Sequence, residues 1–451
     1  MKTVEEKKAE GREYRKVIPR SALGQWDVET NRELVKALLT QQESRRVPLL
    51  VPLRHQRMAV SPFTFFRGSA ILQAHDLAMT PYTDLRVQGC GDAHISNFGI
   101  FASPERRMVF DINDFDETLP IPFDCDIKRL AASVEICGRD RGFSPQDRAE
   151  AVYQTANMYR ESMNKFSETG TLNVWYDHID IENATAEYGH ITDEEHMKII
   201  QKITKKATQK NSNRAIKKYT EVVDGKLRIK SDPPILTPLR DLVGEEKASF
   251  GFSHNIADTL EIYKQTLPEE RRRILNEYVP VEMAHKVVGV GSVGTQAWIL
   301  VLMGRNPDDP LVLQIKEANE SVLEPWFGAS KYTAMGQRVV EGQRAIQTAG
   351  DILLGWLTLK TQNGYAKSYY VRQFWDAKGS FDLEKIDPAG LTALGSMCAW
   401  TLAHAHAKTG RRHIISGYLG NGDVFENAMV RYASAYADQV EADYELFLKM
   451  I

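Results

Sequence analysis

The pattern of apolar and polar residues predicts helices at both ends of the chain. Apolar residues that recur every three or four positions share one face of a helix. This spacing occurs in five stretches: 29–40, 126–138, 145–220, 387–410 and 421–451. The third stretch is long enough for several helices. Asp126 is the expected N-cap of the second stretch, and Asp387, followed by Pro388, is the expected N-cap of the fourth.

A β-rich segment lies between these helical regions. Residues 286–304 and 308–318 combine β-branched and apolar residues around glycine turns, and residues 368–376 form another apolar run, so all three predict strands. Residues 336–356 have the spacing of a helix. Earlier in the chain, the Asp-Gly pair at 224–225 predicts the turn of a short hairpin.

Together these patterns predict an α+β fold with a small antiparallel β lobe and a large, mainly helical lobe. A chain of 451 residues is too long for one ordinary core, which agrees with such a division. We expect four parts: an N-terminal helical extension in 1–60, a large helical lobe in 61–283, a small β-rich lobe in 284–380, and C-terminal helices in 381–451 that return to the large lobe.

Composition narrows the classes of function. Hydrophobic residues make up 43% of the chain and charged residues 26%, which is ordinary for a globular protein. The net charge of −3 gives no electrostatic reason to expect nucleic acid or a membrane surface as a partner. The first twenty residues lack the apolar core of a signal peptide, and no window resembles a membrane span. The four scattered cysteines indicate reduced thiols, so we expect a cytoplasmic protein.

Polar residues gather in one short stretch of the first third. Asp92 is followed five positions later by Asn97, and a short apolar strand then leads to Asp111, Asp114 and Asp116. Phosphoryl transfer uses such a set, because one carboxylate receives the proton of the acceptor hydroxyl while an amide and a second carboxylate hold Mg²⁺ against the phosphates of ATP. The stretch therefore predicts one half of an ATP- and Mg²⁺-dependent site.

The β-rich segment contains the other half. Gly289, Gly291 and Gly294, with Ser292 among them, have G-x-G-x-x-G spacing between two predicted strands. A dinucleotide-binding turn would instead open a helix, so the context favours a hairpin that covers phosphates, as in kinases. The next strand ends at Lys316, which is a candidate for contact with the phosphates.

A carboxylate is expected to hold Lys316 extended toward the phosphates. Glu341, within the predicted helix 336–356, is the candidate partner. Three rival partners lie closer in the chain: Glu317, Glu320 and Glu324. The alternative explanation is an ordinary lysine at the end of a strand and a solvated glutamate on a helix, because surface ion pairs contribute little.

Three other features are interpreted structurally. Arg67 stands among three phenylalanines in residues 61–68, which is typical of a core segment with a surface or salt-bridged arginine, and contact with a phosphate is the alternative. The basic stretch 198–218 is typical of a solvated helical face. His404 and His406 cannot share one face of a helix, so they predict no metal site.

The segments GDAHISNFG and VFDINDFDE resemble the catalytic loop and the metal-binding segment of aminoglycoside-phosphotransferase-like and other protein-kinase-like enzymes. The whole chain also resembles a bacterial family of unknown function that carries these motifs. The resemblance implies that Asp92 is the catalytic base, that Asn97 and Asp114 bind Mg²⁺, and that Asp116 is a further possible contact.

The same resemblance assigns the remaining candidates. Asp114 is preferred to Asp111 because Asp126 follows it at the spacing at which related phosphotransferases place the aspartate that opens the next helix. Lys316 is implied to touch the α and β phosphates. The residues implied to cover the nucleotide are Gly289, Gly291, Ser292 and Gly294.

Two departures from the resemblance bear on the fold. Cys90 stands where these enzymes usually have a histidine. The order of the motifs is also inverted, because the glycine hairpin and the lysine follow the catalytic loop by about 200 residues. Circular permutation reconciles the two orders if the helix that ends near residue 410 leads into Asp92 and the former ends are joined around 240–285. We therefore expect a circularly permuted, two-lobed protein-kinase-like fold.

The expected function is transfer of a phosphoryl group from Mg-ATP to a hydroxyl-bearing acceptor, either a small molecule or a protein. Two alternatives are a pseudokinase that holds a nucleotide or regulates a partner without phosphoryl transfer, and an enzyme that transfers AMP. A two-metal phosphoesterase, suggested by Asp92 and His94, is disfavoured because the chain has no convincing second metal-binding segment. Residues 145–280, where we expect the acceptor site, do not identify the acceptor.

Overall fold

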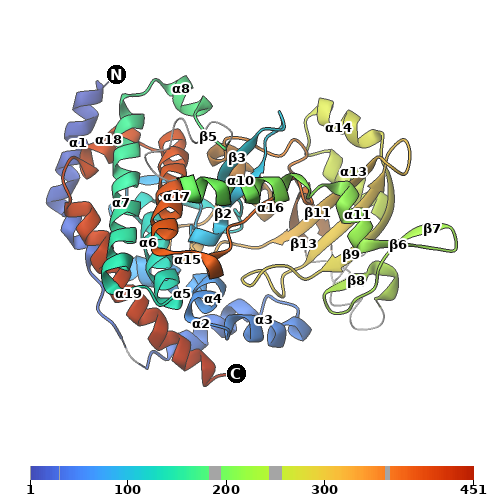
Figure 1. The fold of residues 1–451 in the computed structure, drawn as a ribbon, viewed down its shortest axis with the longest axis horizontal. Helices are drawn as coiled ribbons and strands as arrows, with labels where there is room; N and C mark the ends of the chain where they lie inside the picture. Colours follow the sequence, from blue (N-terminus) through green and yellow to red (C-terminus); the bar gives the residue numbers. More distant parts are fainter. Residues whose placement is uncertain (1, 30, 182–193, 243–255, 361–365) are drawn as a thin grey trace.

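A computed structural model describes residues 2–29, 31–181, 194–242, 256–360 and 366–451. In this part of the chain, helices gather on one side and a six-stranded antiparallel sheet lies on the other (Figure 1). The α+β class and the separation of a sheet from a helical region agree with the prediction. Residues 182–193 of the predicted helical stretch 145–220 lie outside the described residues.

Four long helices form the centre of the helical region: α6 (Phe123–Asp140), α7 (Pro145–Glu168), α17 (Pro388–Thr409) and α19 (Val424–Leu448). α17 packs along α7, and α19 packs against both α6 and α7. Their apolar faces join in one core that includes Leu130, Tyr159, Leu402 and Tyr432. At its edge, α1 (Val4–Val17) packs against α18 (Arg412–Leu419), as Figure 1 shows.

The predicted start of α17 is confirmed. Asp387 accepts a hydrogen bond from Gly390 N at 2.7 Å, and Pro388 occupies the first turn, where its missing N–H costs no helical hydrogen bond. The predicted start of α6 is wrong, because the helix begins at Phe123 and Asp126 is buried inside its first turn. Asp126 therefore cannot act as the N-cap, and its carboxylate bonds to another segment.

The large sheet has the order β12 (Gly355–Lys360), β13 (Ala366–Gln373), β11 (Pro310–Ala318), β10 (Ala297–Met303), β9 (Val279–Lys286) and β8 (Leu236–Pro238). Side chains of one face, such as Leu300 and Ile315, pack in one apolar cluster with residues of α13 (Ile256–Lys264) and α14 (Glu269–Asn276). Because β8 and most of β9 precede residue 284, the sheet begins earlier than the predicted lobe boundary.

The predicted helix 336–356 is shorter in the structure. α16 (Met335–Ile346) ends ten residues early, and residues 347–354 lead from it into strand β12. Leu353 is apolar and buried, but it packs against the sheet cluster rather than on a helix face. Asp351 fixes the intervening turn by accepting hydrogen bonds from Leu353 N and Gln373 N.

Small strands frame the acidic stretch. The pairs are β1 (Arg86–Gly89) with β4 (Leu119–Pro122), and β2 (Phe98–Ala102) with β3 (Met108–Ile112), which also pairs with β5 (Ile179–Asp180). The predicted hairpin at 224–225 is confirmed as β6 (Thr220–Val223) and β7 (Lys226–Ile229).

The remaining helices used below are α2 (Leu34–Glu43), α3 (Val51–Met58), α4 (Pro62–Gly68), α5 (Ala70–Met79), α8 (Thr171–Tyr176), α10 (Glu194–Thr208), α11 (Ser212–Tyr219) and α15 (Glu324–Phe327). The segment after α2 touches the turn between β9 and β10, because Val47 N donates to Gly294 O at 2.8 Å. Among the described helices, none is long and apolar enough to cross a membrane. All four cysteines are buried free thiols.

Candidate functional site

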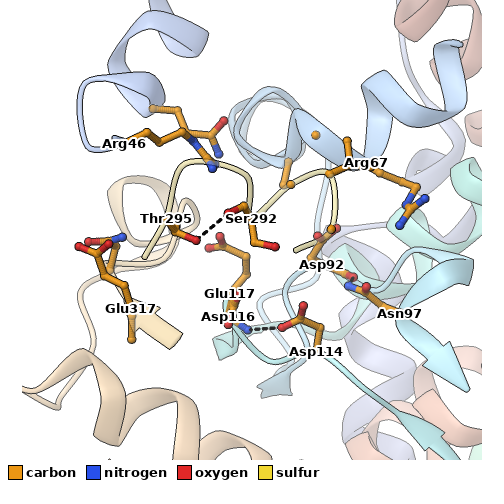
Figure 2. Close-up of a pocket in the computed structure, with 18 of the residues that line it drawn as sticks. Arg46, Arg67, Asp92, Asn97, Asp114, Asp116, Glu117, Ser292, Thr295 and Glu317 are labelled. Carbon is orange, nitrogen blue, oxygen red and sulfur yellow. Dashed lines mark hydrogen bonds between the residues drawn. The ribbon is translucent and has the colours of Figure 1, made fainter. Parts of the chain in front are cut away.

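A cavity lies where the acidic stretch meets the turn between β9 and β10. It encloses about 900 Å³, counting the part open to solvent. Figure 2 shows carboxylates and Asn97 below the turn that carries Ser292 and Thr295. The predicted site residues that line it are Asp92, Asn97, Asp114, Asp116, Gly289, Gly291 and Ser292. Residues far apart in the sequence therefore share one cavity.

The loop after β1 holds Asp92 and Asn97 in a compact turn. Asp92 O accepts hydrogen bonds from His94 N at 2.9 Å and from Asn97 Nδ2 at 2.6 Å, and Asn97 N donates to His94 O at 2.8 Å. The side-chain amide of Asn97 thus donates to the backbone. Its Oδ1 remains as the acceptor atom of the side chain.

Asp126 fixes the start of this loop from below. Its carboxylate accepts hydrogen bonds from Cys90 N at 2.7 Å and from Gly91 N at 2.9 Å. His406 Nε2 lies 3.2 Å from the same carboxylate, and the hydroxyl of Tyr159 bonds to His406 Nδ1 at 2.7 Å. The loop is therefore held by a buried chain of side chains, although Cys90 stands where a histidine was expected to contribute.

The two carboxylate oxygens of Asp92 have different surroundings: Oδ1 contacts an arginine closely, whereas Oδ2 has only a more distant histidine nearby. Arg129 Nε and Nη2 both lie 2.8 Å from Asp92 Oδ1, while His94 Nε2 is 3.7 Å from Oδ2. Burial lowers the pKa of His94 to about 3, so its imidazole is neutral at physiological pH and adds no positive charge. This arrangement leaves Oδ2 as the more available acceptor for a proton.

Lys316 meets two acids of the predicted metal-binding segment. Its Nζ is 2.8 Å from Asp116 Oδ2 and 3.5 Å from Asp114 Oδ2, and the hydroxyl of Tyr370 donates to Asp116 Oδ1 at 2.7 Å. Burial opposes ionisation of Asp114, but the positive charges of Lys316 and Arg372 lower its pKa to about 2. Burial and the charge of Asp114 raise the pKa of Asp116. The predicted meeting of Lys316 with the acidic stretch is therefore confirmed.

Asp111, the alternative to Asp114, lies outside this cavity. It is 3% exposed, and its carboxylate accepts hydrogen bonds from Ile112 N at 2.7 Å and Thr348 N at 2.9 Å. Burial raises its pKa to about 6. Its contacts join β3 to the segment after α16, so the role of Asp111 is to hold these two segments together.

The glycine turn between β9 and β10 is held from outside the sheet. Gly289 and Gly294 have φ of +68° and +92°, a region that favours glycine. Arg46 Nη1 donates to Val293 O at 2.5 Å, and Arg57 donates to Gly289 O. Gly289 and Gly291 line the cavity, whereas Gly294 packs on the Arg46 side chain.

The predicted pair of Glu341 with Lys316 does not form. Glu341 pairs with Arg344 at 3.0 Å. α16 presents a different residue to the acidic stretch, because Arg338 donates to Thr118 O and Asp116 O, each at 2.7 Å. The rival glutamates have other partners as well: Glu317 bonds to Gln296 N and Lys367, Glu320 to Arg45, and Glu324 to Ser321 N and Ser330 N.

Two arginines face the acids across the cavity, and sequence reasoning gave them little weight. Arg46 and Arg67 both line it (Figure 2). Their Nε atoms are buried and have no hydrogen-bond partner among the described residues. Burial lowers the pKa of each guanidinium, so a bound anion would relieve the cost of burying these charges. The only sequence signal for Arg67 was its place in an aromatic segment, and Arg46 had none.

The residues around Asp114 fit a hard divalent cation. Asp114 Oδ1 and Asn97 Oδ1 are oxygen ligands of the kind that Mg²⁺ prefers. No group of three or more His, Cys, Asp or Glu side chains arranged to hold a metal is found in the described ranges. A magnesium ion here would take its other ligands from phosphate and water, as is usual when Mg²⁺ accompanies a nucleotide.

The comparisons with known proteins identify a family but no characterised relative. The model of a family described as "Uncharacterized protein conserved in bacteria (DUF2252)" matches residues 46–450, which is most of the chain. No curated protein and no solved structure matches the chain.

Proposed function

The chain belongs to that uncharacterised bacterial family, and within it we propose that this protein is a Mg²⁺- and ATP-dependent phosphotransferase with the parts of a kinase site in permuted order. It transfers the terminal phosphoryl group of ATP to a hydroxyl-bearing acceptor. The single observation that carries the proposal is the contact of Lys316 with Asp116 and Asp114 beside Asp92 and the glycine turn.

Each part of the reaction then has a residue of suitable chemistry. The acceptor hydroxyl gives its proton to Asp92 Oδ2, while its oxygen forms a bond to the γ-phosphorus of ATP. The bond between that phosphorus and the β–γ bridging oxygen breaks, and ADP leaves with the electron pair. Arg129 keeps Asp92 in place through its contact with Oδ1.

Mg²⁺ supplies charge neutralisation and orientation of the phosphates, and Asn97 and Asp114 are the residues that would hold it. Lys316, Arg46 and Arg67 provide the protein's own positive charges around the phosphates. Three cations are useful here because six of the residues that line the cavity are acids, whose charges would repel ATP.

Two contacts support the permuted arrangement. Gln88 N, in the strand that enters the Asp92 loop, donates to Thr409 Oγ1 at the end of α17 at 3.2 Å. A Cβ added to Gly410 would lie 2.5 Å from Val87 Cγ1, so the two segments touch closely. The end of α17 thus lies beside β1, as expected if the chain was opened between this helix and the catalytic loop.

Nucleotide turnover by the purified full chain tests the proposal. With Mg²⁺ and ATP, we expect release of ADP with water as a slow acceptor, and a loss of about 100-fold or more in Asp92→Asn and Asp114→Ala, because base and metal effects have this size. Asp224→Asn is the control, since Asp224 is exposed in the β6–β7 turn and its φ of +49° suits asparagine.

Unchanged turnover in both active-site variants would contradict the proposal. Release of AMP instead of ADP would replace it with nucleotidyl transfer. Thermal stabilisation by Mg-ATP without any product would favour a nucleotide-binding regulator.

A further inference from the structure

A second compartment continues from the catalytic cavity. It encloses about 990 Å³, again counting the part open to solvent. Its lining overlaps with that of the catalytic cavity at Gln42, Arg46, Glu117, Thr295, Asn319 and Glu320. Because the two linings share these residues on several segments, the two compartments lie side by side.

The far wall of the second compartment is apolar. Leu38 of α2, Ile71 of α5, and Val322 and Trp326 at α15 line it. Trp326 and Leu38 are partly exposed, so their surfaces are available to a ligand. Amide side chains from Gln41, Gln42 and Asn319 stand at its edge. An aromatic ring beside donors and acceptors is the environment that suits a heteroaromatic base.

The walls of this compartment are held in place by α5. Arg32, just before α2, donates to Asp76 of α5 at 2.8 Å, and both side chains are buried. His75 of the same helix packs edge-on against Trp326, with ring centroids 4.9 Å apart. Gln42 Oε1 accepts a hydrogen bond from Arg54, which leaves its amide N–H₂ as a donor. The compartment is therefore a formed site with oriented groups.

The opposite side of the acids offers less space. There, Arg372 Nη1 donates to Asn113 O at 3.0 Å, and Tyr370 bonds to Asp116. The cavity beside Asn113, Arg372 and Lys378 encloses about 350 Å³ on the same measure and shares no lining residue with the catalytic cavity. A ligand bound at Asp114 thus has more space on the side of α2 and Trp326 than on the side of Arg372.

We infer that the second compartment binds the purine base of the nucleotide, with the base against Trp326 and Leu38 and the phosphates running past Arg46 to Asp114. This inference rests on the proposed function, because it assigns the base of the same ATP. Arg46 stands at the junction of both compartments with a buried Nε that has no partner in the described part of the chain, which suits a phosphate or ribose oxygen there.

Comparing ATP with inorganic triphosphate, each with Mg²⁺, separates the contacts of the base from those of the phosphates. Calorimetric titration of the full chain gives both dissociation constants. In Trp326→Leu and, independently, Leu38→Gln, we expect ATP to bind about 10-fold more weakly, because base stacking has this size. Triphosphate affinity is expected to stay within about 2-fold of wild type, since neither residue lines the catalytic cavity.

Trp175→Leu is the matched control, because Trp175 is exposed on α8 and lines neither compartment. ATP affinity unchanged in both compartment variants, or ATP and triphosphate bound equally well by wild type, would overturn the inference and leave the proposed function standing. Failure of wild type to bind either ligand would instead overturn the proposed function, and the inference with it.

Discussion

Lys316 Nζ lies 2.8 Å from Asp116 Oδ2, although 200 residues separate them in the chain. The lysine is 3% exposed and the side chain of the aspartate 31%, so the pair closes the inner end of the cavity while its acidic side still meets solvent. The contact joins the sheet to the acidic stretch. It therefore has consequences for both stability and binding.

Removal of the lysine charge is expected to destabilise the fold. In Lys316→Met, Asp114 and Asp116 lose their nearest cation, and we expect a loss of about 2 kcal/mol at pH 7, below the usual range for a fully buried pair because Asp116 is partly exposed. The deficit shrinks as pH falls, because the raised pKa of Asp116 lets it become neutral. Urea unfolding at pH 7 and pH 5 measures both effects.

A double-mutant cycle with Asp116→Asn checks the origin of this loss. If the pair is responsible, Lys316→Met costs less in the Asp116→Asn background than in wild type. Equal costs in the two backgrounds would show that the loss does not come from the pair with Asp116.

Gly91 is expected to tolerate no side chain. Its φ is +84°, and a Cβ would lie 2.2 Å from Glu117 O, which Ser321 Oγ holds through a hydrogen bond. Gly225 has a similar φ of +73° but open space around its Cβ position. We expect Gly225→Ala to cost about 1 kcal/mol and Gly91→Ala about 3 kcal/mol or more, measured by urea unfolding. Similar costs for both would mean that the Asp92 loop shifts freely.

Acid is expected to destabilise the protein through buried histidines. Burial lowers the pKa of His404 to about 4, against about 6.5 in the unfolded chain. A lowered pKa of a base gives stability that is present above pH 6.5 and is lost as pH falls toward 4. His404→Gln should lose about 2 kcal/mol less than wild type between pH 7 and pH 5, measured by urea unfolding at both values. His285 and His94 contribute the same trend and remain in the variant. An identical loss in both proteins would contradict the assignment.

Local patterns predicted those parts of the fold that depend on neighbouring residues. The Asp387 cap follows from one side chain and the next turn of helix. The glycine turn between two strands follows from the β-branched and apolar residues on both sides of it and from the conformational freedom of Gly289. Helical spacing failed at β12 because residues such as Leu353 satisfy a helix period and a sheet core equally well.

A contact between distant segments was predictable only where both segments were assigned to the same proposed nucleotide site. Lys316 and Asp114 were expected together because the resemblance assigns both to one nucleotide, the lysine to its phosphates and the carboxylate to Mg²⁺. The partner of Lys316 was not predictable, since Glu341 and Asp116 are both carboxylates and only the direction of α16 separates them. Arg46 could not be predicted as a site residue, because nothing in the sequence around a single arginine shows that it lines a cavity.

Substitution of Arg67 is expected to weaken the binding of phosphates without destabilising the fold. Its buried Nε has no partner among the described residues, and burial lowers the pKa of its guanidinium, so Arg67→Met removes a costly buried group and is expected to leave the unfolding free energy unchanged or higher. If the guanidinium contacts a phosphate, the variant loses a charge-assisted hydrogen bond, and both Mg-ATP and Mg-triphosphate should bind about 10-fold more weakly. Calorimetric titration and urea unfolding on the same samples measure the two effects.

Arg305→Met, an exposed change near the β10–β11 turn, is the control. Unchanged triphosphate affinity would remove Arg67 from the phosphate site, and a large loss of stability would return it to the role of a core arginine.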